Sequence, residues 1–242
     1  MTSTSHSSQN VQAPELDAAQ LVAEADTGGR QPKDPVSRWV LLLVPVAWSL
    51  FQLWYASPFP YSLGFGVLNA GEARAIHLAF GFVLVFAAYP ALKSSPRDRI
   101  PLQDWFLAIL AAACALYIFV FQGELARRPG LPTTTDVVVG VAGVLFLLEA
   151  ARRSLGVALP IVAILFLVYA FFGPYMPDLF AHRGASVPRA ATQYWLTAEG
   201  VFGVALGVST SFVFLFVLFG SLLEKAGAGN YIIQVAFALL GH

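Results

Sequence analysis

The sequence predicts an all-α polytopic membrane protein with six transmembrane helices plus the start of a seventh, and with a cytoplasmic N terminus. Hydrophobic residues make up 57% of the 242 residues and charged residues 12%, whereas a soluble domain has about 25% charged residues. The mean hydropathy is correspondingly high, at +0.69. The apolar residues form continuous runs without the two-residue alternation of a membrane β-barrel, so helices are the expected spanning elements.

Residues 1–37 precede the first apolar run and are rich in Ser, Thr, Gln, Ala and acidic residues. Such a composition buries too little apolar surface to fold, so this segment is predicted to be a disordered cytoplasmic tail. It also lacks the apolar core of a cleavable signal peptide. The first membrane helix is therefore expected to act as an uncleaved anchor.

Six apolar runs are long enough to cross a bilayer as helices, which takes roughly 17 to 25 residues. They are residues 39–56, 75–92, 105–121, 135–151, 157–173 and 201–223. Trp39 and Trp105 lie at the ends of two runs, where the amphipathic indole prefers the membrane interface. A further apolar segment begins at Tyr231 and indicates the start of a seventh helix.

The positions of the 14 Lys and Arg residues predict an internal N terminus, because positively charged loops tend to remain in the cytoplasm. With that orientation the outer segments hold Arg74, Arg127, Arg128, Arg183 and Arg189, and the inner segments hold all the others. The formal net charge is zero, which offers no basic surface of the kind that nucleic acid requires. No nucleic acid partner is expected.

His77 is the only histidine within a predicted span, and Glu72 and Arg74 stand just before it. An ionisable group in a membrane span suggests function, such as a proton relay. However, His77 lies about one turn from the predicted interface, where an imidazole can find water or a neighbouring side chain. The structural interpretation is therefore favoured over the relay. Cys114, the only cysteine, lies in an apolar run and is expected to be a small packing residue.

Glu149 precedes Arg152 and Arg153 by three and four residues, a spacing that places the three side chains on one helix face. A structural ion pair at the cytoplasmic end of the span is the favoured interpretation, and a transport site is the alternative. Asp136 follows a run of three threonines, a pattern typical of a capped helix start.

Ser209, Thr210 and Ser211 interrupt the sixth apolar run near its middle. Small hydroxyl residues permit close helix packing and interhelical hydrogen bonds, and they can also line a transport path. Packing is favoured, because three hydroxyls without a charged neighbour make a weak ion site.

Enzyme motifs are absent from the sequence. It contains no H-E-x-x-H zinc pair, no G-x-S-x-G elbow and no phosphate-binding G-x-x-x-x-G-K-[ST] loop. No catalytic, cofactor-binding or metal-binding residues are predicted, and the chain is not expected to be an enzyme. A transporter built on it would need an ion gradient or a separate ATPase.

Two stretches carry a family resemblance: EAARRSLGVALPIVAILFLVYAFFGPYMP (149–177) and TAEGVFGVALGVSTSFVFLFVLFGSLLEKAGAGNYIIQVAFALLGH (197–242). They resemble the fused membrane permease of tripartite ATP-independent periplasmic (TRAP) transporters, in particular the 4TM/12TM fusion type that pairs with TAXI-class binding proteins. The block FGSLLEKAGAG is the most specific part. Over residues 39–148 the resemblance rests on position and on four spans.

The resemblance implies three parts: a tail over 1–37, a small-subunit-like four-helix domain over 38–152, and the start of the large permease domain over 153–242. It implies binding-protein-dependent, sodium-coupled uptake of organic-acid solutes across the bacterial inner membrane. The expected partners are a periplasmic solute-binding protein of TAXI type, the remainder of the fused permease, and the lipid bilayer. The family's sodium ligands are expected beyond His242, in a continuation of the chain.

Two further interpretations remain open. The chain could be a non-transporting membrane scaffold or assembly subunit. The predicted outer loop over 174–200, with Arg183, Arg189, Tyr194 and Trp195, could dock a binding protein or lie on the membrane surface.

Overall fold

The computed structural model describes residues 29–92 and 94–240, and in this part of the chain all regular structure is helical. The elements are α2 (Pro35–Ala56), α3 (Phe59–Leu63), α4 (Ala70–Ala88), α5 (Leu102–Arg127), α6 (Thr134–Leu155), α7 (Ala158–Phe172), the 3-10 turn η1 (Gly173–Tyr175), α8 (Val187–Ala191), the π-helical turn η2 (Thr192–Leu196), α9 (Val204–Val208), the π-helical turn η3 (Ser209–Val213), α10 (Phe214–Lys225) and α11 (Ala228–Leu240).

In the described part of the chain, six helical stretches are long and apolar enough to cross a membrane, which confirms the predicted all-α fold with six spans. They are residues Pro35–Ala56, Ala70–Ala88, Leu102–Arg127, Thr134–Leu155, Ala158–Tyr175 and Val204–Lys225. The last of these joins α9, η3 and α10 into one continuous helix.

The second span runs over 70–88 rather than the predicted 75–92, because local signals set both ends. The Asn69 side chain accepts from the Glu72 backbone N–H at 3.0 Å, and the Glu72 carboxylate accepts from the Asn69 N–H at 2.8 Å. This reciprocal pair begins the helix before the apolar run. Tyr89 is extended, with φ −108° and ψ 126°, as expected for a residue that precedes a proline.

Other boundaries also differ from the predicted ones. The sixth span begins at Val204 rather than at 201, because residues 197–203 form a turn whose Val201 N–H donates to the Tyr194 carbonyl at 2.8 Å. The seventh segment begins at Ala228 rather than at Tyr231. It follows Gly227, whose φ of 81° lies in the left-handed region that glycine adopts at low cost.

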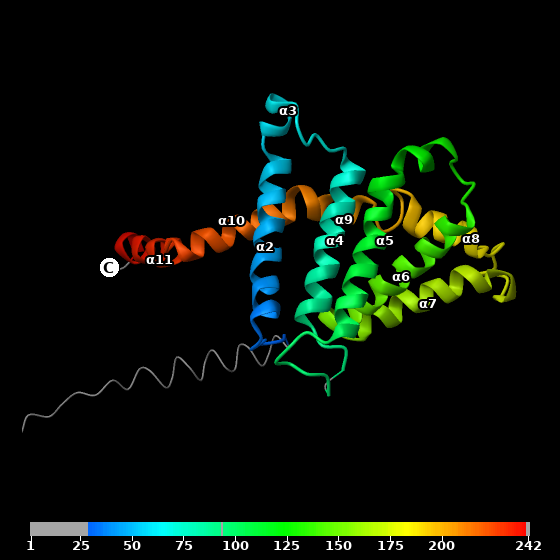
Figure 1. The fold of residues 1–242 in the computed structure, drawn as a ribbon, viewed down its shortest axis with the longest axis horizontal. Helices are drawn as coiled ribbons and strands as arrows, with labels where there is room; N and C mark the ends of the chain where they lie inside the picture. The colour runs from blue at the N-terminus through cyan, green and yellow to red at the C-terminus, as the bar shows by residue number, and fades with distance from the viewer. Residues whose placement is uncertain (1–28, 93, 241–242) are drawn as a thin grey trace, which may run out of the picture.

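Helices α2, α4 and α5 lie side by side in Figure 1, with α6 beside α5 and α7 running obliquely next to α6. The pair α4 and α5 packs most extensively. Its buried core consists largely of alanines, namely Ala75, Ala79, Ala108, Ala111 and Ala115, each at most 7% exposed. Small side chains let membrane helices approach closely, so this pair is the centre of the bundle.

The chain from α9 to α11 crosses the bundle and extends beyond α2 (Figure 1). No residue of α10 is buried, and large apolar side chains such as Phe216 and Phe237 are each 72% exposed. In a bilayer such faces meet acyl chains or other protein. The described residues therefore bury much of the α4–α5 pair but little of the segment from α9 to α11.

Residues 1–28 of the predicted tail lie outside the described residues. The remaining part, residues 29–37, is described, and Pro35 to Ser37 form the first turn of α2. Asp34 caps that helix, since its side chain accepts from the Ser37 N–H at 2.8 Å.

Candidate functional site

A polar seam joins the bundle to the helix formed by α9, η3 and α10. It consists of Trp48 and Gln52 on α2, Arg74 and His77 on α4, and Ser209 at the start of η3. The α4 side chains reach the seam because Arg74 and His77 are three residues apart and share one face. The seam is the place where segments more than 120 residues apart meet.

His77 lies at the centre of the seam and is only 5% exposed. The Trp48 indole N–H donates to its Nδ1 at 3.1 Å, and the Gln52 amide also contacts Nδ1. Its Nε2 lies 3.2 Å from the Ser209 hydroxyl oxygen. Because an indole nitrogen can only donate, Nδ1 of His77 is the acceptor. Nε2 therefore carries the hydrogen and donates a hydrogen bond to the Ser209 hydroxyl. This is a neutral imidazole that connects three helices.

Aromatic rings enclose this imidazole. Trp48 meets the His77 ring edge-on at a centroid distance of 4.8 Å, and Phe214 packs against Trp48 at 4.9 Å. Gln52 is fully buried, and its Oε1 has no hydrogen-bond partner among the described atoms. The enclosed geometry suits the structural interpretation of His77 better than a relay.

Arg74 extends the seam one turn further along α4. Its Nη1 donates to the Phe202 carbonyl oxygen at 2.8 Å. The guanidinium packs against Gly207, where an added Cβ would lie 2.6 Å from Nη2. Gly207 therefore admits the arginine head group into the helix contact, which the sequence did not indicate.

The three predicted hydroxyl residues do not share one face. Ser209 binds His77, Thr210 is buried and donates to the Leu206 carbonyl at 2.7 Å within its own helix, and Ser211 is exposed. Only the first makes an interhelical hydrogen bond with a described residue. Within the described residues, these three hydroxyls therefore do not form a row on one face.

Trp195 lies on η2 and is fully buried, although the sequence suggested a surface role in an outer loop. Its indole N–H donates to the Cys114 carbonyl at 3.2 Å. The ring fills a notch at Gly143 on α6, where any Cβ would overlap it, and Ala191 sits close to Gly140. The two glycines, three residues apart on α6, were the only sequence signal for this docking. Cys114 is itself buried in the apolar core, in agreement with the predicted packing role.

The predicted trio of Glu149, Arg152 and Arg153 forms part of a larger ionic network. Glu149 accepts from Arg152 Nε at 2.8 Å and from Arg153 Nε at 2.7 Å. Arg153 also donates to Asp104 at 2.8 Å, and the second oxygen of Asp104 pairs with Arg30. The sequence pattern did not point to Asp104 and Arg30, which are separated by 74 residues.

Because the charges of this network are buried, each of them depends on its partners for compensation. The side chains of Arg30 and Asp104 are fully buried, and that of Arg153 is 2% exposed. Arg30 also donates to the carbonyl oxygens of Phe86 and Ala87 at 2.9 and 3.0 Å, at the C-terminal end of α4, where cations are favoured. Removing one partner of such a buried pair costs about 3–5 kcal/mol.

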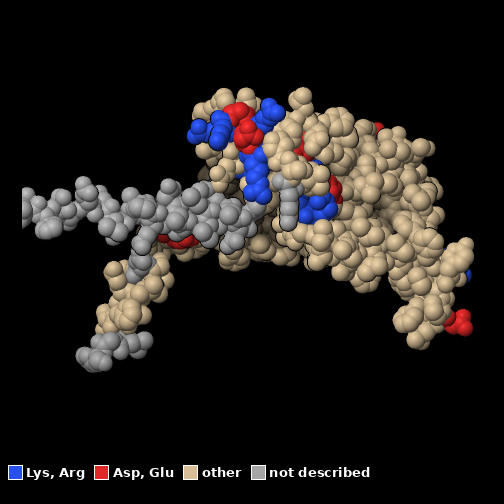
Figure 2. All heavy atoms as spheres, turned by 90° about the horizontal axis from the view of Figure 1, so that it is seen from below, with Lys and Arg blue, Asp and Glu red and all other residues tan. Residues whose placement is uncertain are grey.

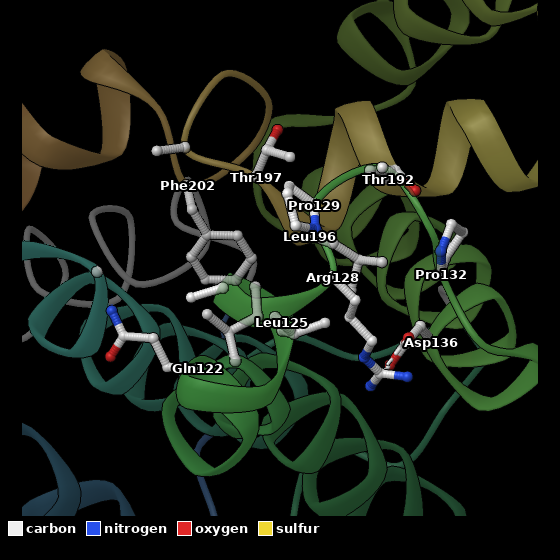
Figure 3. A pocket seen from close by; sticks show the side chains of 15 residues that line it. Gln122, Leu125, Arg128, Pro129, Pro132, Asp136, Thr192, Leu196, Thr197 and Phe202 are labelled. Carbon is white, nitrogen blue, oxygen red and sulfur yellow. Dashed lines mark hydrogen bonds and ion pairs between the residues drawn. The ribbon is translucent and has the colours of Figure 1, made fainter.

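A cavity of about 270 Å³ opens at the opposite end of the bundle, between the α5–α6 connection and residues 192–202 (Figure 3). Leu125, Leu196 and Phe202 form apolar walls. Arg128 points toward Asp136, and its Nη2 lies 3.2 Å from that carboxylate. The predicted cap at this helix start is present, because the side chains of Asp136 and Thr133 each accept from the other's backbone N–H.

The cavity has limited chemistry of its own. The Arg128 charge is balanced by Asp136, which also accepts from the Tyr117 hydroxyl at 2.6 Å. The rest of the lining is mostly apolar, and Arg128 Nε has no hydrogen-bond partner among the described atoms. Within the described residues, no three His, Cys, Asp or Glu side chains are grouped so as to hold a metal.

Comparison with known proteins identifies part of the chain. Residues 142–242, from within α6 through α11, match the family model of the DctM component of tripartite ATP-independent periplasmic transporters. No curated protein and no solved structure matches the chain. This family is a transporter component and not an enzyme family. The resemblance to the TRAP permease is thus confirmed over these residues, and the chain is a multi-pass helical membrane protein that carries a segment of that permease family.

Proposed function

We propose that this chain is the N-terminal, bracing part of the permease of a TRAP-type secondary transporter of the 4TM/12TM fusion type. In this proposal, helices α2, α4, α5 and α6 form the small-subunit-like four-helix domain of residues 38–152. They hold the start of the large permease domain, residues 153–242, in place through the polar seam and the Trp195 notch. The permease takes up organic-acid solutes that a TAXI-type periplasmic binding protein delivers, and a sodium gradient drives the uptake across the bacterial inner membrane.

One observation carries the proposal: the segment over 153–242 is seated on the four-helix domain that precedes it by specific buried contacts. His77 and Arg74 reach into α9 and η3, and Trp195 enters the face of α6. Such contacts suit a bracing part, because a packed interface with fitted side chains resists sliding. The sodium and substrate ligands are expected in later elements of the permease.

Uptake by the full-length permease tests the function. The permease is reconstituted in proteoliposomes with its binding protein, and entry of radiolabelled small carboxylates is measured. Uptake is expected to require both the binding protein and an inward sodium gradient. Uptake that persists when potassium replaces sodium would rule out sodium coupling, and uptake without the binding protein would rule out that partner.

A disulfide tests the bracing role separately. A Cβ at Gly140 would lie 3.0 Å from the Ala191 Cβ, close to the roughly 3.5–4.5 Å that a disulfide spans. Gly140→Cys with Ala191→Cys, in a Cys114→Ala background, is expected to oxidise readily and to leave uptake within about two-fold of the reduced form. Loss of uptake on oxidation, with recovery on reduction, would show that this contact moves during transport.

The loop between α7 and α8 is the proposed contact for the binding protein. Arg183 lies in that loop and Arg189 lies on α8, and both are exposed. Arg183→Glu combined with Arg189→Glu is expected to weaken binding-protein-dependent uptake by charge reversal. Unchanged uptake would exclude these two residues from the docking surface.

A further inference from the structure

Four exposed cations gather at the end of the bundle where α2 begins, and we term them the basic rim. Lys33 and Arg38 lie at the start of α2, and Arg97 and Arg99 lie in the α4–α5 connection. Figure 2 views the molecule from this end and shows Lys and Arg side chains gathered there. The two pairs come from segments about 60 residues apart, so the rim exists only in the folded chain.

Backbone hydrogen bonds hold the two segments together. The Gln31 N–H donates to the Arg97 carbonyl at 3.0 Å, and the Lys33 N–H donates to the Asp98 carbonyl at 2.7 Å. The Ile100 N–H donates to the Ser37 hydroxyl at 3.3 Å. The rim is therefore preformed, and its charges do not have to be gathered when a ligand binds.

The rim cations differ from the other arginines at this end in their pairing. Arg30, Arg152 and Arg153 are neutralised by Asp104 and Glu149 in the buried network. In contrast, none of the four rim cations forms an ion pair with a described residue. Two carboxylates, Asp34 and Asp98, lie in the same segments, so the rim keeps a net positive charge.

The rim also lies at the level where lipid headgroups are expected. The first membrane span begins at Pro35, between Lys33 and Arg38. Trp39 follows directly and is 60% exposed, and an exposed indole at the end of a span prefers the membrane interface. These two cations are therefore within about one helical turn of the interface.

We propose that the basic rim binds the headgroup phosphates of anionic phospholipids in the inner leaflet. A cluster of Lys and Arg directly beside a membrane helix is attracted to anionic lipid, by a factor of about 5 in affinity for each cation near the surface. The binding anchors the α4–α5 connection and the start of α2 to the same lipids. It is independent of transport and rests on the predicted internal N terminus.

Lipid titration of the purified 242-residue chain in neutral micelles tests the proposal. Phosphatidylglycerol and phosphatidylcholine with brominated acyl chains are added separately, and quenching of tryptophan fluorescence reports binding. Phosphatidylglycerol is expected to bind more tightly than phosphatidylcholine, and the difference is expected to shrink at high salt. Equal binding of the two lipids by the native chain would overturn the proposal.

A charge-removal variant locates the binding. Arg38→Gln, Arg97→Gln and Arg99→Gln together are expected to lower the affinity for phosphatidylglycerol at least about 10-fold and to leave that for phosphatidylcholine unchanged. Circular dichroism establishes that the variant is folded. If it does not fold, the lipid preference and salt dependence of the native chain decide the question.

A matched variant removes three exposed cations from other parts of the chain: Arg127→Gln, Arg183→Gln and Arg189→Gln. Its affinity for phosphatidylglycerol is expected to stay within about two-fold of the native value. An equal loss in this variant would show that total charge, and not the rim, attracts the lipid. Displacement of phosphatidylglycerol by an equal concentration of inorganic phosphate would show that the rim is a site for free anions, which also contradicts the proposal.

Discussion

Gly143→Ala is predicted to change stability in opposite directions depending on whether Trp195 is present. The nearest atoms to a Cβ at Gly143 are Cε2, Cζ2 and Cδ2 of the Trp195 indole, and the added carbon would overlap them. The ring cannot swing aside easily, because its N–H is bonded to the Cys114 carbonyl and Phe202 packs edge-on at 5.3 Å. Overpacking of this kind costs about 1–3 kcal/mol.

The same substitution is expected to stabilise the Trp195→Ala variant. Trp195→Ala alone costs about 3–5 kcal/mol, because a fully buried ring is lost and a cavity remains. With the ring gone, the methyl group that Gly143→Ala adds has space, and alanine is favoured over glycine in a helix by about 1 kcal/mol. The coupling between the two substitutions is therefore expected to be roughly 2 kcal/mol or more.

The assay is unfolding of the purified chain in mixed micelles by increasing SDS, followed by far-ultraviolet circular dichroism so that the lost tryptophan does not affect the signal. Gly123→Ala is the control, because Gly123 lies inside α5 and has no heavy atom within 4 Å of an added Cβ. It should stabilise both backgrounds equally. A Gly143→Ala effect that is the same with and without Trp195 would refute the notch.

Three further predictions concern polar groups. Asp104→Asn leaves the buried arginines of the ionic network without full charge compensation and is expected to destabilise the chain by about 3–5 kcal/mol in the same assay. The control is Glu124→Gln, which removes an exposed ion pair with Arg128 at 3.9 Å and should change stability by no more than about 0.5 kcal/mol. Ser209→Ala removes the acceptor of a buried imidazole N–H and should cost about 1–3 kcal/mol, whereas Ser211→Ala, on the exposed face, should be neutral; equal effects would contradict the seam. Hydrogen bonds from Ser37 lower the pKa of the Asp34 carboxyl. The contribution of Asp34 to stability is therefore present above the ordinary carboxyl pKa and is lost as pH falls through the lowered pKa. The loss of stability in acid should be measurably smaller in Asp34→Asn than in the native chain, and identical acid profiles would contradict this assignment.

The helices themselves could be predicted because their signals are local. A run of apolar side chains as long as the bilayer is thick predicts a span without knowledge of its neighbours. The ends were less accurate because caps outweigh hydropathy: Asn69 begins α4 before its apolar run, and the extended Tyr89 ends it before the run is over. The spacing of Glu149, Arg152 and Arg153 likewise placed them together, since a helix brings residues three and four apart onto one face.

The long-range partners could not be predicted in this way. Nothing in the sequence near Arg30 points to Asp104, and nothing near His77 points to Ser209. Trp195 looked like a loop residue because it lies between two predicted spans, yet Gly143 offers its ring a buried position. The amino-acid sequence alone determined the membrane class, the six spans and the permease resemblance, because these follow from composition, local periodicity and motif. The tertiary structure decided which polar groups meet, because the cost of burying an unpaired charge or amide can be offset only by partners that the fold brings from distant segments.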